Sequence, residues 1–274
     1  MRNEIVMLPI KELMDFEAQP YKVLDDDSMY ELVESIKGVG VLVPIIVRRL
    51  NDRYEIISGH RRKRACELAE IDNIPATIME LDDDEAAIML VDSNLQRENL
   101  LPSEKAYAYK LKLDAIRHQG KKCESFSEHD DELESADIIG TDSNTSGRQI
   151  RRYIRLTELI YPLLDKVDIR IIPITAGAEI SFLNVKLQVT LNEQIEFLEC
   201  KLNTRQAEIL KQYYLDGKLD ERVIKEVLLN QEKSTAVSLN YNKLKKYFPK
   251  HYTAKQCERA LWMILDQWFN KHCA

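Results

Sequence analysis

The residues Ser58-Gly59-His60-Arg61-Arg62-Lys63-Arg64-Ala65 decide the fold that we expect for the first part of this chain. The preceding run, Tyr54 to Ile57, has the aromatic and β-branched composition of a strand, and it stops at the glycine. Four consecutive cations then open a helix, although a helix N-terminus already carries unpaired N–H groups and partial positive charge. The pattern therefore indicates a bound anion, with phosphate as the candidate, or alternatively a solvated basic helix end.

Strand and helix signals alternate around this stretch and predict a small α+β domain. Further strands are predicted at residues 43–50 and 75–79. Capping boxes at Ser28 with Glu31, and at Asp82 with Glu85, predict the starts of two helices. From residue 100 onward the apolar residues recur at helical spacing, and helices are predicted over residues 102–120, 175–191 and 203–215. We expect three parts, an α+β domain at 1–99, an all-α domain at 100–195 and a helical region at 196–274.

The chain is acidic overall, but its charges are segregated along the sequence. Its 274 residues carry a formal net charge of −7. Acidic residues gather in 25–27, 82–85 and 124–137, which we expect to be solvated loops or helix starts, and cations gather in 61–64, 148–155 and 243–250. Net charge decides little when the two signs are segregated, so the basic stretches can still bind a polyanion.

The composition excludes several other classes of protein. No run of 18 apolar residues exists, and the first residues are too short and too acidic for a signal peptide, so we expect no membrane partner and a cytoplasmic protein. The five cysteines are scattered, and the histidines do not join them at zinc-ligand spacing. Neither a disulfide framework nor a zinc site is indicated.

A second basic stretch predicts a DNA-reading helix. Ser146 and Gln149 have the spacing of a capping box, so a helix starts here. At about 100° per residue, one face holds Ile150, Tyr153, Ile154 and Thr157, and the opposite face holds Arg148, Arg151, Arg152 and Arg155. Residues 135–139 and 140–145 would supply the first helix and the turn of a helix-turn-helix motif, although this turn is longer than usual.

In such a motif the start of the second helix lies where base edges are reached. Arg148, Gln149 and Arg152 suit that role, because Arg matches guanine O6 and N7 and Gln matches adenine N6 and N7. Arg155 would contact a phosphate, and Ser146 and Arg151 complete the predicted contact set. The alternative is an arginine-rich surface helix that pairs with the acidic residues 124–137.

Three short motifs resemble the nucleotide-site motifs of ParB/RepB/Spo0J-type partition proteins in order and spacing. They are Pro44-Ile45-Ile46-Val47-Arg48, Gly59-His60-Arg61-Arg62-Lys63-Arg64-Ala65 and Asn94-Leu95-Gln96-Arg97-Glu98. With the helix from Arg148 to Leu159, the resemblance covers about residues 5 to 190. It implies a ParB/sulfiredoxin-like α+β domain followed by a helix-turn-helix domain and a helical C-terminal region.

The resemblance also implies a function. It is that of a dimeric clamp that binds CTP with Mg²⁺ in the first domain and a centromere-like site on double-stranded DNA through the helix-turn-helix. On matching positions the nucleotide pocket would consist of Arg48, Gly59, His60, Arg61, Arg62, Asn94 and Arg97, with Asn94 also at the metal. A DNA-bound protein of this kind would be associated with the nucleoid.

Three departures from the family pattern qualify this expectation. His60 and Ser93 each occupy a position where the family usually has Glu. Because a hydroxyl is a poorer Mg²⁺ ligand and water-positioning group than a carboxylate, CTP hydrolysis is expected to be weak or absent, unless the neighbouring Asp92 substitutes. Only Arg2 stands before the first strand, whereas relatives that stimulate a ParA-type ATPase commonly carry a longer basic tail, so no residues support that partner.

The last helix is expected to begin at a capping box of Thr253 and Gln256. Its broad apolar face holds Ala260, Leu261, Ile264, Leu265, Trp268 and Phe269. This face predicts dimerisation or, alternatively, packing onto its own domain. The basic residues 242–250, with interleaved aromatic residues, would be a second DNA contact that does not depend on sequence.

Two other functions compete with a CTP-gated partition protein. One is a helix-turn-helix transcriptional regulator with a degenerate nucleotide domain. The other is an enzyme, a ParB-like nuclease or a sulfiredoxin-like protein. The second is disfavoured, since Cys66 lies within a helical stretch and no paired carboxylates of nuclease type can be assigned.

Overall fold

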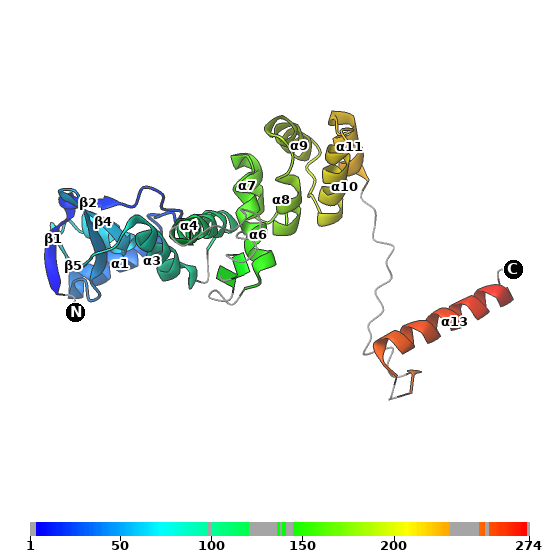
Figure 1. Ribbon diagram of the computed structural model, residues 1–274, viewed down its shortest axis with the longest axis horizontal. Coiled ribbons are helices and arrows are strands. Elements are labelled where there is room, and N and C mark those ends of the chain that lie inside the picture. The colour runs from blue at the N-terminus through cyan, green and yellow to red at the C-terminus, as the bar shows by residue number, and fades with distance from the viewer. Residues whose placement is uncertain are drawn as a thin grey trace. The chain divides into compact units, whose positions relative to one another are not determined.

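The computed structural model describes residues 4–97, 100–120, 136–137, 139–140, 145–230, 247–249 and 252–272. The chain divides into two compact units, Met1–Leu229 and Asn230–Ala274. The first unit begins with a mixed α/β sheet domain and continues as a largely helical region, which confirms the predicted fold class (Figure 1). The domain boundaries after residues 99 and 195 stay a prediction.

The sheet has five strands in the order β1-β5-β3-β4-β2. They are β1 (Ile5–Pro9), β2 (Leu13–Asp15), β3 (Ile45–Leu50), β4 (Arg53–Ser58) and β5 (Asn73–Met79). β5 pairs antiparallel with β1 and parallel with β3, β3 pairs antiparallel with β4, and β4 pairs parallel with β2. The three predicted strands are therefore confirmed as the central strands β3, β4 and β5.

Helices cover both faces of the sheet. The first face packs against α1 (Asp27–Val39) and α2 (His60–Leu68), and the second packs against α3 (Asp83–Leu95). The alternation of side chains along β4 separates the two cores, because Ile56 joins the cluster of α1 and α2 whereas Ile57 joins the cluster of α3. This arrangement brings the N-terminus of α2 and the C-terminus of α3 to the sheet from opposite sides.

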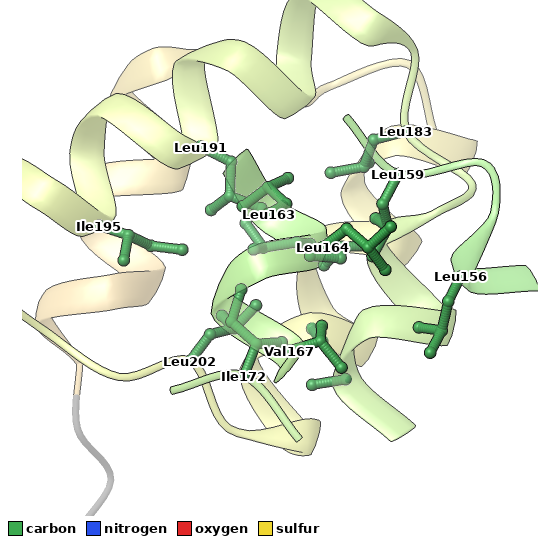
Figure 2. Packing of buried hydrophobic residues seen from close by; sticks show 14 of the residues in the cluster. Leu156, Leu159, Leu163, Leu164, Val167, Ile172, Leu183, Leu191, Ile195 and Leu202 are labelled. Carbon is green, nitrogen blue, oxygen red and sulfur yellow. The ribbon is translucent and has the colours of Figure 1, made fainter. Parts of the chain in front are cut away.

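The helical region is built around one large apolar cluster, part of which is seen in Figure 2. Its helices are α4 (Pro102–Gly120), α6 (Gly147–Leu156), α7 (Tyr161–Asp168), α8 (Ile174–Ile180), α9 (Val185–Phe197), α10 (Thr204–Leu215) and α11 (Glu221–Leu229). The periodic stretch 175–191 is helical as predicted, but it is divided between α8 and α9. Asn184 caps α9, its side chain accepting a hydrogen bond from the Leu187 amide at 3.0 Å.

The helix starts were predicted with one error. Asp26, and not Ser28, caps α1, since the Asp26 carboxylate accepts a hydrogen bond from the Met29 amide at 2.9 Å. Ser28 instead donates its hydroxyl to Asp26 at 2.7 Å. The capping box of α3 and the Ser146 cap of α6 are both present. An aspartate two residues earlier supplies a carboxylate, which is the better acceptor for the partial positive charge of the helix start.

Helix α4 is fixed to both parts of the first unit by polar contacts. At its start, Ser103 donates both its amide and its hydroxyl to Asp168 of α7, at 2.8 and 2.6 Å. The buried Glu104 accepts hydrogen bonds from the amides of Lys22 and Leu101, each at 3.0 Å. Further along, Lys112 donates to Asp92 of α3 at 2.7 Å. These contacts connect the sheet domain to the helical region through one helix.

The second unit contains α13 (Ala254–His272). The predicted capping box is present, with the Gln256 side chain accepting a hydrogen bond from the Thr253 amide at 2.8 Å. Trp262 and its three successors Met263, Ile264 and Leu265 are all exposed within this unit. The predicted basic contact at 242–250 lies almost entirely outside the described residues, as do residues 141–144 of the predicted turn. No described helix is long and apolar enough to cross a membrane.

Two glycine substitutions test the packing of the helical region. A Cβ at Gly177 of α8 would lie 2.7 Å from Leu156 Cδ2 and 3.1 Å from Val167 Cγ2, so Gly177→Ala overpacks the core. We expect the free energy of unfolding to fall by about 1–3 kcal/mol. Gly38→Ala in α1 is the matched control, because nothing lies within 4 Å of its Cβ, and it should gain about 0.5 kcal/mol. Urea denaturation followed by far-ultraviolet circular dichroism measures both, and equal effects would contradict the packing.

Candidate nucleotide site and nucleic-acid interface

The first candidate site begins at the turn between β4 and α2. Gly59 has a φ of +112°, and a Cβ there would lie 2.5 Å from Ile45 Cγ2 and 3.0 Å from Arg62 Nη2. Only glycine fits this position, both for its backbone conformation and for its space. The tight turn places the side chains of the first helical turn of α2 beside the loop that precedes β3.

The four cations of α2 have different partners. Lys63 forms an ion pair with Asp15 at 3.1 Å, and Arg64 pairs with Asp25 at 2.6 Å. Arg61 donates to the Ser28 hydroxyl at 2.6 Å and lies 3.7 Å from Asp26. Arg62 donates to the backbone carbonyls of residues 43 and 44. Acidic side chains therefore neutralise the second half of the basic run, while Arg62 keeps its full charge.

Arg97, just after α3, faces the remaining cations. Burial and the neighbouring Arg61 lower the pKa of the Arg97 guanidinium, and burial and Arg97 lower the pKa of Arg62. Among the residues that the structure describes, neither Arg62 nor Arg97 has an ion-pair partner. The guanidiniums of Arg61 and Arg62, at the start of α2, and of Arg97, after the end of α3, thus lie in one partly buried region. Such a cluster favours an anion with several oxygens.

His60 lies beside the cation cluster of Arg61, Arg62 and Arg97. Its Nε2 atom is buried and has no hydrogen-bond partner within the described part of the chain. Burial lowers the pKa of the imidazole to about 4, and Arg97 and Lys63 act in the same direction while Asp15 opposes them. The side chain is therefore neutral near pH 7. An unpaired polar atom at this place suits a ligand that can supply the missing hydrogen bond.

Arg48 was predicted at the nucleotide pocket, but its charge is already neutralised. It is buried on the α3 side of the sheet, where it donates to Glu55 of β4 at 2.6 Å and forms an ion pair with Asp83 of α3 at 2.6 Å. Glu55 is buried as well. The contact fixes the start of α3 to the sheet. A role of Arg48 at the nucleotide stays a prediction.

Asn94 and its neighbours Asp92 and Ser93 are held by other protein groups. The Asn94 amide donates to the Leu90 carbonyl of its own helix at 2.7 Å, and the Ser93 hydroxyl donates to the same carbonyl at 3.0 Å. Asp92 is held by Lys112 of α4. Within the described ranges there is no group of three or more His, Cys, Asp or Glu side chains that could hold a metal. The predicted Mg²⁺ at Asn94 is therefore unsupported by protein ligands.

The second candidate site is the basic face of α6. Ser146 caps the helix by accepting a hydrogen bond from the Gln149 amide at 3.3 Å, and Ile150 is fully buried. Arg148 is exposed at the start of the helix, and Arg151 lies 3.4 Å from Asp137. Ile150 therefore lies on the inner face as predicted, whereas Arg155 of the predicted arginine face packs against Ser181 and Phe182. The DNA contacts themselves stay a prediction.

Arg155 differs from the other arginines because it is fixed within the protein. Its guanidinium donates to the hydroxyl and the carbonyl of Ser181, at 3.1 and 3.0 Å, and lies 4.0 Å from the ring centre of Phe182. Lys211 of α10 lies 3.6 Å from the same ring centre and pairs with Glu179 at 2.9 Å. These contacts connect α6, the end of α8 and α10. The sequence offered no signal for them, since the partners are 26 or more residues apart.

The fold and the cluster define a cationic α/β domain joined to a helical region, and sequence relatives share both parts. Residues 1–95 match the ParB N-terminal domain. A nucleoid occlusion protein from Halalkalibacterium halodurans is 33% identical over 208 residues, which cover 76% of this chain and 67% of that protein. The chromosome-partitioning protein Spo0J of Thermus thermophilus is 32% identical over 208 residues, covering 76% and 70%. The chain belongs to the ParB family, as its motifs predicted.

A solved relative is the C-terminally truncated chromosome-partitioning protein ParB from Caulobacter crescentus. Its structure in complex with the centromeric parS site has a TM-score of 0.46 and 23% identity, covering 76% of this chain and 98% of that chain. Its structure in complex with CTP-gamma-S has a TM-score of 0.33 and 24% identity, covering 70% and 99%. Both ligands are those of the Caulobacter protein.

The role of Arg48 can be separated from nucleotide binding. Arg48→Met should lower the free energy of unfolding by about 3 kcal/mol, because it leaves the buried Glu55 carboxylate without its partner. The double variant Arg48→Met with Glu55→Leu should recover much of this loss. Urea denaturation of the two variants and the unsubstituted protein measures the difference. Loss of nucleotide affinity in Arg48→Met at unchanged stability would instead place Arg48 in the pocket.

Proposed function

We propose that this protein is a CTP-gated, dimeric DNA-binding protein that acts in partition or in nucleoid occlusion. Membership of the ParB family supports the class of function. The single observation that carries the nucleotide part is the convergence of Arg61, Arg62 and Arg97; among the described residues the last two form no ion pair, although Glu104 partly offsets the charge of Arg97. The cytosine base is inferred from the family resemblance, because the cluster itself accounts only for the phosphates.

In the proposed complex the residues of α2 and α3 hold the triphosphate. Gly59 lets the backbone approach the phosphate oxygens, and the N-terminus of α2 adds its partial positive charge. Two backbone carbonyls accept hydrogen bonds from Nη1 of Arg62 and fix its guanidinium, so its other N–H groups would be positioned before the phosphate binds. Arg97 closes the site from the α3 side. Binding would relieve the mutual repulsion of the three guanidiniums, which is a source of affinity for a polyanion.

The proposed DNA interface is the arginine face of α6. Arg148, Gln149 and Arg152 would contact base edges in the major groove, while Arg151 would contact a phosphate. Arg155 would not contact DNA directly but would fix the orientation of α6, since Ser181 and Phe182 hold its guanidinium against the end of α8. A dimer would present two such helices to a two-fold symmetric DNA site. The exposed apolar residues of α13 are the proposed dimer contact.

CTP hydrolysis is proposed to be slow or absent. The Ser93 hydroxyl is engaged with the Leu90 carbonyl, and the Asp92 carboxylate is engaged with Lys112. Neither Ser93 nor Asp92 is therefore free to position a water molecule. The binding of nucleotide, and not its hydrolysis, would then control the affinity for DNA.

Removal of Arg97 tests the nucleotide site. Arg97→Ala should weaken CTP binding about 10- to 100-fold, as expected for the loss of charge-assisted hydrogen bonds. It should not lower the melting temperature of the nucleotide-free protein, because it removes a cation that its neighbours repel. Isothermal titration calorimetry with CTP, UTP and ATP measures affinity and base selectivity, and phosphate release in the same samples should stay slow.

The control is Arg53→Ala, which removes an exposed arginine of β4. Unchanged CTP affinity in Arg97→Ala would refute the site, and no nucleotide binding at all would favour the transcriptional regulator.

A comparison of two neighbouring arginines tests the DNA interface. Arg152→Ala should weaken binding to the specific site by about 1–3 kcal/mol and binding to random DNA much less, if it contacts a base. Arg155→Ala should mainly lower the melting temperature, because it releases the end of α8. Fluorescence anisotropy with specific and random duplexes, together with thermal melts, measures both variants. An equal loss on the two duplexes would reassign Arg152 to a phosphate.

A further inference from the structure

The position of His60 at the cation cluster is the observation from which this inference starts. His60 is the first residue of α2, next to the glycine turn, and the charged groups that act on its imidazole are Asp15, Lys63 and Arg97. Its buried Nε2 has no partner within the described residues, which costs free energy in the protein without ligand. A histidine that served only to pack the helix start would gain nothing from this unpaired atom.

The groups that face His60 come from three elements. Asp15 lies at the end of β2, Lys63 lies one turn along α2, and Arg97 follows α3. Asp15 is itself paired with Lys63 at 3.1 Å. Burial is the main cause that keeps the ring neutral in the free protein; among the charged groups, Asp15 favours the protonated ring, and Lys63 and Arg97 oppose it. A phosphate chain would add negative charge at the imidazole and favour its protonated form.

We propose that His60 is a proton-coupled contact of the bound phosphate chain: the imidazole takes up one proton from solvent on binding and donates through Nε2 to a phosphate oxygen. This inference rests on the proposed nucleotide site and adds a ligand-linked charge to it. Where the family usually has Glu, this chain has a side chain that can become cationic. The site therefore gains a fourth positive group only when the anion is present.

The sign of the pH dependence follows from linkage. Burial and the neighbouring cations hold the pKa of His60 at about 4 in the free protein, and the phosphate charge raises this pKa in the complex. At a pH between the pKa of His60 in the free protein and its pKa in the complex, the protein takes up a proton when the ligand binds. The affinity for the ligand therefore increases as the pH falls towards 5. The effect disappears above the pKa of the complex. Because the terminal phosphate titrates in the same range, only the difference between two proteins isolates the histidine.

Calorimetry at pH 6 in buffers of different ionisation enthalpy counts the protons taken up on binding. The unsubstituted protein should take up more protons than His60→Gln, which keeps a hydrogen-bond donor but does not titrate. The ratio of their affinities should be about tenfold at pH 6 and should approach one at pH 8. His118→Gln is the matched control, because this exposed histidine of α4 pairs with Asp84 and should leave proton uptake unchanged. Thermal melts verify that the variants are folded.

The ligands are CTP and inorganic tripolyphosphate, which separate this inference from the cytidine assignment. Histidine-dependent proton uptake with both ligands supports the inference, even if CTP is not preferred. Equal proton uptake by the unsubstituted protein and His60→Gln overturns the inference while leaving the nucleotide site intact. Absence of binding by either ligand overturns both.

Discussion

Burial of the Arg62 and Arg97 guanidiniums beside other cations is the constraint on which the proposed nucleotide site depends. Arg61, Arg62 and Arg97 lie close enough to influence one another, although like charges separate when they are free to do so. They stay together because each is attached to an element with its own apolar core. The clusters beneath α1 and α2, and beneath α3, bury enough apolar surface to hold the helix ends in place. In the proposed function, the stability of the sheet domain would maintain a cationic site that an anion stabilises.

The acidic stretches have a part in this arrangement that their composition did not indicate. Asp25 and Asp26 were expected in a solvated loop or helix start, yet they pair with Arg64 and Arg61 across the first face of the sheet. Asp83 likewise pairs with the buried Arg48. These acids pair with Arg48, Arg61 and Arg64, whereas Arg62 and Arg97 have no ion-pair partner among the described residues. An overall acidic protein can therefore keep a strongly positive site, since the acids sort the cations into supporting and binding groups.

The sequence predicted features that depend on nearby residues and missed those that depend on distant ones. Strand composition, helical periodicity and the cap of α3 are local, and they were found. The cap of α1 was assigned to Ser28 because Ser28 and Glu31 have the spacing of a capping box. Asp26 can also accept a hydrogen bond, and only the backbone conformation decides which of the two residues precedes the helix. The burial of Arg48 against Glu55 depends on the register of β3 with β4. The fixation of Arg155 by Ser181 requires the fold of α8 against α6. Family motifs named the site, but they could not say which arginines were already neutralised.

Helix α4 is the physical connection between the two candidate sites. Its start is bound through Glu104 to the amide of Lys22, beside the loop that carries Tyr21 towards Arg97, and through Ser103 to Asp168. Its middle packs on α6, where the rings of Tyr109 and Tyr153 lie 5.6 Å apart. A ligand that moves Arg97 therefore acts on a loop that holds the start of α4, and α4 in turn supports the arginine face of α6. Because these contacts are hydrogen bonds to buried groups, they cannot shift independently without leaving a polar atom unpaired. Under the proposed gating, α4 would move as a unit either with α3, against which Ala108 and Ala115 pack, or with α6, against which Tyr109 packs.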